Sequence, residues 1–332
     1  MDPVVSVVLP VYNCPQYVGA AIESILSQTY ADFELIVVDD GSTDQTPAVV
    51  RQYTDPRIRC VTQANEGAAS AANRGIALSR GRYIARQDQD DVSSPPRIAR
   101  QVAFLDAHPA CGLVGTWARI WVENKATARV HAHPSDSACL KFALLFDNPF
   151  VQSSVMLRRA ALDRVGVYCT DRERQPPEDF ELWSRVAREY EIANLPEVLH
   201  LYREVEGSVS RRGPSPFMNH MVTLSAENVA WASGRHLSDP QVINIAALTH
   251  RARHRLQGEP DFAAMREILR AAAVRITGKA GKPFERQIER RISLFRYRLL
   301  ELRHGEGWMR TIPALPQEPR TSRAMLRAAR NT

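Results

Sequence analysis

The stretch Tyr83-Ile84-Ala85-Arg86-Gln87-Asp88-Gln89-Asp90-Asp91 joins a short β-branched and aromatic run to three carboxylates. Alternate residues of an extended strand share one face, so we expect Asp88 and Asp90 to point into the same space. Two carboxylates aimed at one point repel each other unless a cation lies between them. Hard oxygen ligands suit Mg²⁺ or Mn²⁺, which take further ligands from water and substrate phosphates. The alternative is a solvated acidic turn that caps a helix beginning near Pro95.

Strand and helix patterns alternate in the residues before this stretch. Nearly continuous apolar, β-branched runs predict strands buried on both faces, and the segments between them predict helices. The expected strands are 4–9, 33–38 and 58–61, and the expected helices are 17–28, 46–52 and 67–79. Alternation at this spacing indicates an α/β fold with a parallel sheet and right-handed crossovers.

Polar turns follow the carboxyl ends of three of these strands, at residues 10–13, 39–40 and 88–91. Ligands of such sheets bind beyond the carboxyl ends of the strands, so we expect the three turns to line one cleft. The first turn lacks the Gly-x-Gly-x-x-Gly pattern with which dinucleotide-binding folds hold a pyrophosphate. Because the cleft rim is acidic, a phosphate-bearing ligand needs a cation to offset the repulsion. This combination points to a nucleotide-diphosphate donor held through a metal ion.

Length and composition are those of a globular protein, since 332 residues can form two domains or one large domain with an appendage. The five cysteines are scattered and lack Cys-x-x-Cys spacing, which favours reduced thiols in a cytoplasmic protein. The sequence contains neither a signal-peptide pattern nor an apolar run long enough to span a membrane.

The net charge of +6 is unevenly distributed along the chain. Residues 251–332 contain 19 Lys or Arg against 8 Asp or Glu, whereas residues 1–250 contain 24 against 29. No zinc finger, helix-turn-helix or aromatic RNA-reading motif accompanies the basic region, so we expect no nucleic-acid partner.

An ordered set of motifs resembles the family 2 glycosyltransferases, which are inverting, nucleotide-sugar-dependent enzymes of GT-A fold. The motifs lie at residues 7–13, 27–30, 34–44, 73–76, 83–91, 101–105 and 177–183. The resemblance implies a GT-A (Rossmann-like) α/β fold, with a mixed, mostly parallel sheet flanked by helices and a C-terminal helical extension. It also implies Mg²⁺ or Mn²⁺ as cofactor and a nucleotide sugar as donor.

The resemblance implies roles for the matching residues. The donor nucleotide would be bound by Pro10, Tyr12, Asp40 and Asp88, and the metal by Asp90, Asp88 and Asp91. Asp40 would accept a hydrogen bond from the donor's base, and Tyr12 would offer a stacking face. Asp88 would lie nearer the ribose, with Asp90 on the metal and Asp91 assisting.

Asp179, with Glu178 beside it, matches the family's general base. An inverting transfer needs one group to take the proton from the acceptor hydroxyl as this hydroxyl attacks the anomeric carbon. The other interpretation is structural, because acidic residues in the first turn of a helix are favoured by its dipole. A helix is expected here after Pro176 and Pro177, and both interpretations can hold together.

The chain departs from the family pattern at several positions. Ala72 and Gln152 stand where relatives often have Arg and His, respectively. Val205 stands where relatives often have a further metal-ligating His, so Glu204, Glu206 or water would have to substitute. These departures bear on the metal's affinity more than on the fold.

The expected organisation is a GT-A domain at 1–210, a linker at 211–216, a helical extension at 217–310 and a loosely ordered basic tail at 311–332. The GT-A domain would divide into a nucleotide-binding half at 1–108 and an acceptor half at 109–210. Sugar-stacking candidates in the acceptor half, each a residue type more often found in the core, are Trp117, Trp121, Trp183 and Tyr202. His131 and His133 are more typical of a loop than of a metal site.

Four helices are expected after the linker, at residues 217–233, 239–256, 261–276 and 284–303. The last combines apolar residues at three- and four-residue spacing with many arginines. This pattern favours a small helical bundle packed on the catalytic domain. The alternative is peripheral association of the basic helices with an anionic membrane at the inner face of the plasma membrane, near a lipid-linked acceptor. Flotation with anionic vesicles would test that alternative.

We therefore expect a transfer of one sugar, with UDP as the expected carrier, to a hydroxyl of a cell-surface polysaccharide, lipopolysaccharide or glycolipid precursor. The absence of the Gln-x-x-Arg-Trp signature and of membrane spans argues against a membrane-embedded polymerase. Two other classes are considered. A sugar nucleotidyltransferase should carry a Gly-rich, Arg- or Lys-bearing first loop, which this chain lacks. A catalytically inactive nucleotide-sugar-binding module would share the fold.

Overall fold

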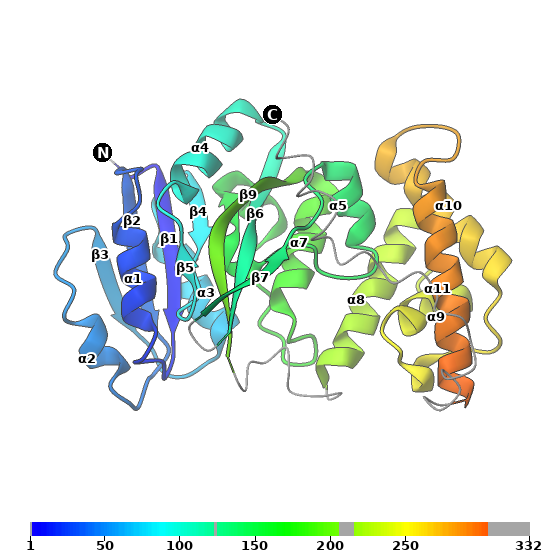
Figure 1. The fold of residues 1–332 in the computed structure, drawn as a ribbon, viewed down its shortest axis with the longest axis horizontal. Helices are drawn as coiled ribbons and strands as arrows, with labels where there is room; N and C mark the ends of the chain where they lie inside the picture. The colour runs from blue at the N-terminus through cyan, green and yellow to red at the C-terminus, as the bar shows by residue number, and fades with distance from the viewer. Residues whose placement is uncertain (1, 123–124, 206–215, 305–332) are drawn as a thin grey trace.

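The computed structural model describes residues 2–122, 125–205 and 216–304 (Figure 1). Within these residues nine strands form one mixed sheet in the order β3-β2-β1-β4-β8-β6-β9-β5, with β7 paired to β6. The strands are β1 (Val5–Val11), β2 (Phe33–Asp39), β3 (Ile58–Thr62), β4 (Tyr83–Arg86), β5 (Val92–Ser93), β6 (Cys111–Val122), β7 (Lys125–His131), β8 (Met156–Arg158) and β9 (Glu191–Glu204). The helices are α1 (Val18–Leu26), α2 (Thr46–Val50), α3 (Ala68–Leu78), α4 (Arg97–Ala107), α5 (Ser137–Ala143), η1 (Gln152–Ser154), α6 (Arg159–Val165), α7 (Glu178–Glu189), α8 (Pro216–Ser233), α9 (Pro240–Thr249), η3 (Arg253–Arg255), α10 (Phe262–Thr277) and α11 (Glu285–His304).

Strands β1 to β4 form the parallel part of the sheet, with β1 between β2 and β4. Both faces of β1 are covered: Val7 and Leu9 belong to the same core as α1, whereas Val8 belongs to the opposite core with α3. This two-sided burial explains the nearly continuous apolar runs. Gly75 of α3 lets the helix lie close to the sheet, because a Cβ there would meet Val8 Cγ1 at 2.4 Å. The predicted mixed, mostly parallel sheet flanked by helices is confirmed.

The rest of the sheet, formed by β5, β6, β7, β8 and β9, lies against the parallel part. β8 pairs antiparallel with both β4 and β6, and β6 runs parallel to β9 along most of its length. The short strand β5 pairs with β9 at Val92 and Leu201. The carboxyl end of β9 is therefore held beside the acidic turn that follows β4.

Helices α8 to α11 lie together at one end of the molecule, beside α5 (Figure 1). Their apolar residues share one core with Phe142 and Phe146, which belong to α5 and the turn after it. The predicted C-terminal helical extension is confirmed. The predicted helix 239–256 is wrong in its second half, because α9 ends at Thr249 and Arg251 has a positive φ of 55°.

Several predictions on domain organisation fall outside the described residues. The expected linker 211–216 is described only at Pro216, where α8 begins, and the tail 311–332 is not described. The boundaries at 108, 210 and 310 stay predictions.

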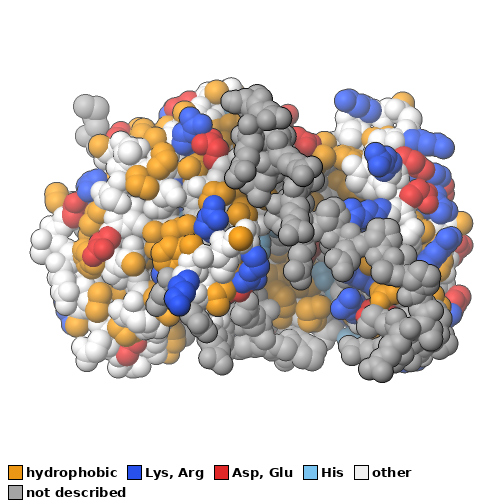
Figure 2. Space-filling model, in the orientation of Figure 1, with side chains coloured by type: hydrophobic (Ala, Val, Ile, Leu, Met, Phe, Trp, Pro, Cys, Tyr) orange, Lys and Arg blue, Asp and Glu red, His pale blue; other side chains and the backbone are white. Residues whose placement is uncertain are grey.

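Lys and Arg side chains gather over α10 and α11, with Asp and Glu among them (Figure 2). Many of these arginines form ion pairs, namely Arg266 with Glu289, Arg270 with Glu285 and Arg303 with Glu259. The ion pairs neutralise part of the basic surface. None of the described helices combines the length and apolar character that crossing a membrane requires. Peripheral membrane association stays a prediction.

Candidate functional site

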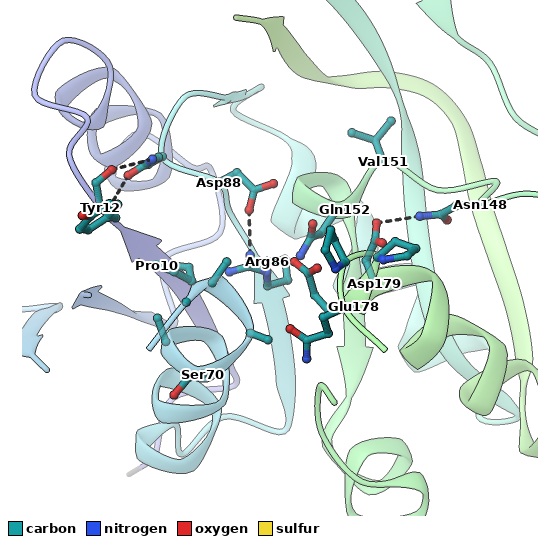
Figure 3. A pocket seen from close by; sticks show the side chains of 18 of the residues that line it. Pro10, Tyr12, Ser70, Arg86, Asp88, Asn148, Val151, Gln152, Glu178 and Asp179 are labelled. Atoms are coloured by element: carbon teal, nitrogen blue, oxygen red, sulfur yellow. Dashed lines mark hydrogen bonds and ion pairs between the residues drawn. The ribbon is translucent and has the colours of Figure 1, made fainter. Parts of the chain in front are cut away.

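A large cleft of about 1080 Å³ opens beyond the carboxyl ends of β1, β2 and β4. All eight predicted site residues line it, namely Pro10, Tyr12, Asp40, Asp88, Asp90, Asp91, Glu178 and Asp179. Figure 3 shows Asp88 on one side of the cleft and Glu178 and Asp179 on the other. The expectation that the strand-end turns share one cleft is therefore confirmed, whereas the role of each residue stays a prediction.

The acidic residues after β4 lie in a turn and not on a strand. Because β4 ends at Arg86, the prediction that Asp88 and Asp90 alternate along an extended strand is wrong. The side chain of Gln87 closes the turn by donating from Nε2 to the backbone oxygens of Asp88 (3.1 Å) and Asp91 (2.9 Å). The turn at 88–91 is therefore held by hydrogen bonds from the Gln87 side chain and not by backbone hydrogen bonds to a neighbouring strand.

Asp88 forms an ion pair with Arg86, whose Nη2 lies 2.8 Å from its Oδ1 (Figure 3). The Arg86 side chain is only 3% exposed, so the pair lies at the floor of the cleft. Burial raises the pKa of Asp88, and Arg86 opposes this shift. Arg86 is not among the predicted site residues, although its position two residues before Asp88 was a usable signal.

Asp91 anchors the acidic turn to β9 and to η1. Its Oδ1 accepts a hydrogen bond from the Arg203 backbone N–H (2.8 Å), and its Oδ2 accepts one from the Ser153 hydroxyl. The Nε2 of His200 lies 3.3 Å from the same Oδ2. Both oxygens of this buried carboxylate thus have protein partners. Its predicted assistance to a metal stays a prediction, and its observed contacts hold the turn in place.

Asp90 is the carboxylate of the turn that best fits a cation. Burial, then the charges of Asp91 and Asp88, raise the pKa of Asp90, and a nearby cation would favour its ionised form. The described residues contain no cluster of three His, Cys, Asp or Glu arranged to hold a metal. Mg²⁺ and Mn²⁺ tolerate few protein ligands when substrate phosphates and water complete the set. A cation that binds at Asp90 together with a diphosphate stays a prediction.

The predicted substitutes for the missing histidine differ in their surroundings. Glu204 is paired with Arg129, whose Nη2 lies 2.6 Å from its Oε2. Glu206 lies outside the described residues. Gln152, at the start of η1, lines the cleft.

Asp179 lies in the first turn of α7, which begins at Glu178 as predicted. Its Oδ2 accepts a hydrogen bond from Asn148 Nδ2 (2.7 Å; Figure 3). Its Oδ1 accepts one from the Phe180 N–H, also at 2.7 Å. Asn148 Oδ1 in turn accepts from the Phe150 N–H (3.1 Å), which determines the orientation of the amide. Burial, then the charge of Glu178, raise the pKa of Asp179 to about 7. A carboxylate with this pKa is suited to general-base catalysis near neutral pH.

Asp40 directly follows β2, and its carboxylate is held by residues that lie just before α3. Its Oδ1 accepts a hydrogen bond from Gln63 Nε2 (2.8 Å), and its Oδ2 accepts one from the Gly67 N–H (2.8 Å). Tyr12, 42% exposed, is fixed through its backbone, because its N–H donates to Gln89 Oε1 (2.7 Å). Gln89 thereby connects the turn after β1 to the acidic turn.

The aromatic candidates differ in position. Tyr202 lines the cleft, whereas Trp183 is fully buried in the core and the Trp117 indole N–H donates to the His133 backbone oxygen (2.9 Å). His131 and His133 also line the cleft. The prediction that His131 lies in a loop is wrong, because it ends β7. His131 and His133 are two residues apart, and this spacing places side chains on one face of an extended segment. The spacing was the sequence signal that could have assigned both histidines to the cleft.

Comparisons with known proteins point to one family. The sequence profile of glycosyl transferase family 2 matches residues 6–166. A Haemophilus influenzae protein named "Uncharacterized glycosyltransferase" is 31% identical over 262 residues, which are 74% of this chain and 79% of that protein. The Escherichia coli protein UDP-Glc:alpha-D-GlcNAc-diphosphoundecaprenol beta-1,3-glucosyltransferase WfaP is 30% identical over 212 residues, covering 62% of this chain and 79% of WfaP.

Solved structures share the fold at lower identity. S. aureus TarS 1-349, solved in complex with UDP-GlcNAc, has a TM-score of 0.61 at 19% identity, with 92% of both chains covered. The mannosyltransferase PcManGT from Pyrobaculum calidifontis, solved with GDP-Man and Mn²⁺, has a TM-score of 0.50 at 20% identity, with 99% of this chain and 80% of that chain covered. The chain therefore belongs to glycosyl transferase family 2 and is a glycosyltransferase of GT-A fold.

Proposed function

We propose that this glycosyltransferase moves one sugar from a UDP-sugar to a hydroxyl of a cell-surface glycan precursor, with inversion at the anomeric carbon. The observation that carries the proposal is the convergence of Asp40, Asp90 and Asp179 on one cleft. Asp40 supplies a hydrogen-bond acceptor for the nucleobase, and Asp90 supplies a ligand for a cation. Asp179 accepts the proton of the acceptor hydroxyl. The relative WfaP, named for a UDP-Glc donor, and the TarS complex with UDP-GlcNAc support UDP as the carrier.

The donor's nucleoside lies at the tips of β1 and β2 in this proposal, with Pro10 and Tyr12 beside the base. Asp40 Oδ2 already accepts one hydrogen bond from Gly67 and keeps capacity for an N–H of the base. Because two backbone amides and Gln63 hold this carboxylate, its acceptor position is set before the donor binds. Asp88 lies nearer the ribose.

Asp90, with Asp88 beside it, would hold Mg²⁺ or Mn²⁺, and the Mn²⁺ in the PcManGT complex supports this choice. When bound, such an ion acts as a Lewis acid that offsets the charge of the leaving diphosphate. Asp91 keeps the turn in position through its contacts with β9. The chain's own contribution is thus to hold acidic oxygens where the diphosphate arrives.

Asp179 takes the proton from the acceptor hydroxyl as the hydroxyl oxygen forms its bond to the anomeric carbon. The bond between that carbon and the diphosphate oxygen breaks, and the diphosphate leaves with the electron pair. Attack from the face opposite the leaving group inverts the configuration. Asn148 and the Phe180 N–H hold the carboxylate in one orientation, which leaves its remaining lone pairs for the acceptor.

Turnover assays with a panel of UDP-, GDP- and dTDP-sugars, each with and without Mn²⁺, test the proposal. We expect Mn²⁺-dependent release of UDP from one UDP-sugar. Binding of UDP-sugars with no turnover of any of them would favour the inactive binding module. Formation of a UDP-sugar from UTP and a sugar phosphate would instead assign the chain to the nucleotidyltransferases.

Asn148→Ala is expected to move the acid limb of the kcat/KM profile to higher pH. Asp179 acts as a base only when ionised, so the wild-type rate should fall as the pH drops below its pKa of about 7. The Asn148 amide donates to the ionised form of Asp179 and lowers its pKa. Loss of the amide should therefore raise the pH midpoint of the acid limb by about one pH unit. Profiles from pH 5 to 9 measure the shift. An unmoved limb would show that Asn148 does not act on the base.

A further inference from the structure

Three aromatic side chains from β7, β9 and the loop after β7 form a cluster in the cleft wall. The ring of His131 stacks on that of His133, with centroids 5.7 Å apart and planes 11° apart. Tyr202 meets His131 edge-on, at 5.5 Å and 80°. All three residues line the cleft and each is half-buried. The fold thus preassembles the rings and leaves part of their surface open to a ligand.

The aromatic cluster is tied to the proposed base through one buried side chain. Asn194 Nδ2 donates to the backbone oxygens of Pro134 and Pro149, both at 3.1 Å. Pro134 directly follows His133, and Pro149 directly follows the asparagine whose amide holds Asp179. Asn194 is 3% exposed, so this connection lies in the interior. The position of the rings relative to the base is therefore set by the fold.

The same cluster is tied to the acidic turn. Tyr202 precedes Arg203, whose backbone N–H donates to Asp91 Oδ1 and whose Nε donates to the Asp90 backbone oxygen, both at 2.8 Å. The aromatic cluster is therefore connected to both the diphosphate end of the cleft and Asp179. An acceptor must reach the same region, because its hydroxyl has to contact the anomeric carbon and the base together.

The charge state of the two histidines indicates what kind of group they bind. Burial lowers the pKa of His131, and burial together with His131 lowers the pKa of His133 to about 4. Both imidazoles are neutral near pH 7, and a neutral imidazole offers one donor and one acceptor. That pairing matches sugar hydroxyls, whereas a phosphate is bound more strongly by charged donors, which the two neutral rings do not supply. Aromatic rings also present apolar faces on which the C–H side of a pyranose can pack.

We propose that His131, His133 and Tyr202 form the subsite for the acceptor sugar ring whose hydroxyl loses its proton to Asp179. This inference rests on the proposed function and names the acceptor class: a neutral pyranoside at the end of the acceptor, not a phosphate group. The three residues bind and orient this sugar, and they take no part in the proton transfer.

The variants His133→Ala and Tyr202→Ala test the subsite. The backbone at position 133 is held by the Trp117 indole, so removal of the imidazole leaves that contact intact. The probes are the methyl pyranosides of glucose, galactose, mannose and N-acetylglucosamine, with binding measured by saturation-transfer NMR in the presence of UDP and Mn²⁺. His236→Ala, an exposed histidine that does not line the cleft, is the matched control.

We expect the wild type to bind at least one glycoside, and each variant to bind it at least about fivefold more weakly with unchanged UDP affinity. The His236→Ala control should bind like the wild type. The subsite is overturned if the wild type binds UDP but no glycoside, if both variants bind the glycoside as the wild type does, or if they lose UDP affinity in parallel. A wild type that does not bind UDP would instead remove the proposed function, so the two failures are distinguishable.

Discussion

Asp179→Asn is expected to lower kcat by about 10³-fold, the typical contribution of a general base, while UDP affinity stays at the wild-type level. The carboxylate is the proton acceptor, and asparagine has the same shape without the basicity. Asp179 lies on α7, whereas the residues proposed to hold the nucleotide lie at or just after the carboxyl ends of β1, β2 and β4. Steady-state kinetics with the donor found in the panel, together with calorimetric titration of UDP, measures the two quantities separately.

Glu178→Gln is the comparison that separates the two adjacent carboxylates. After burial, the charge of Glu178 is the largest contribution that raises the pKa of Asp179. Its removal should therefore shift the acid limb of the rate profile to lower pH, with a far smaller loss of kcat. If Glu178→Gln were the inactive variant and Asp179→Asn turned over normally, the assignment of the base would move to Glu178.

The parallel half of the fold was predictable because its physics is local. Buried β-branched runs define β1 and β2 to within a residue or two, and parallel strands bring their carboxyl ends to one edge of the sheet. This single rule is enough to place Asp40 and Asp90 in one cleft although 50 residues separate them. Asp179 was predicted to belong to the same site only because its motif resembles that of the family. No spacing in the sequence predicted it.

What sequence analysis missed depends on side chains that meet only after folding. The acidic residues leave the strand because Gln87 bonds to its own turn, which no periodicity reveals. Asn148 reaches Asp179 across 31 positions, and His131 faces the cleft because β7 pairs with β6, beside β9. In the C-terminal helices the same limit applies, since α9 ends at Thr249 and the positive φ of Arg251 was not predictable from the residue pattern. Contacts of this kind follow from tertiary structure and not from pattern.

Asp90→Asn is expected to remove most of the gain in UDP affinity that Mn²⁺ produces. Coupling between two ligands is reciprocal and typically reaches factors of 5 to 150, so we expect roughly 100-fold in the wild type and a factor near 1 in the variant. The reason is the small number of protein ligands: both carboxylate oxygens of Asp91 have protein partners, and the Val205 side chain has no atom that can bind a metal. With so few oxygens from the chain, cation and diphosphate each depend on the other. Calorimetric titration of UDP with and without Mn²⁺ measures the factor.

Glu66→Gln is the matched control, because Glu66 lines the same cleft but its backbone N–H donates to Asp40 and its carboxylate accepts a hydrogen bond from Ser70. It should keep the full effect of Mn²⁺ on UDP affinity. If both variants lost that effect equally, the general negative charge of the cleft would be responsible and not a ligand at position 90. If neither lost it, or if the wild type bound UDP equally well with and without Mn²⁺, Asp90 would have no part in holding a cation. The raised pKa of Asp90 would then reflect only a crowded, buried carboxylate. The donor's diphosphate would have to be balanced by Arg86, the buried cation that already neutralises Asp88.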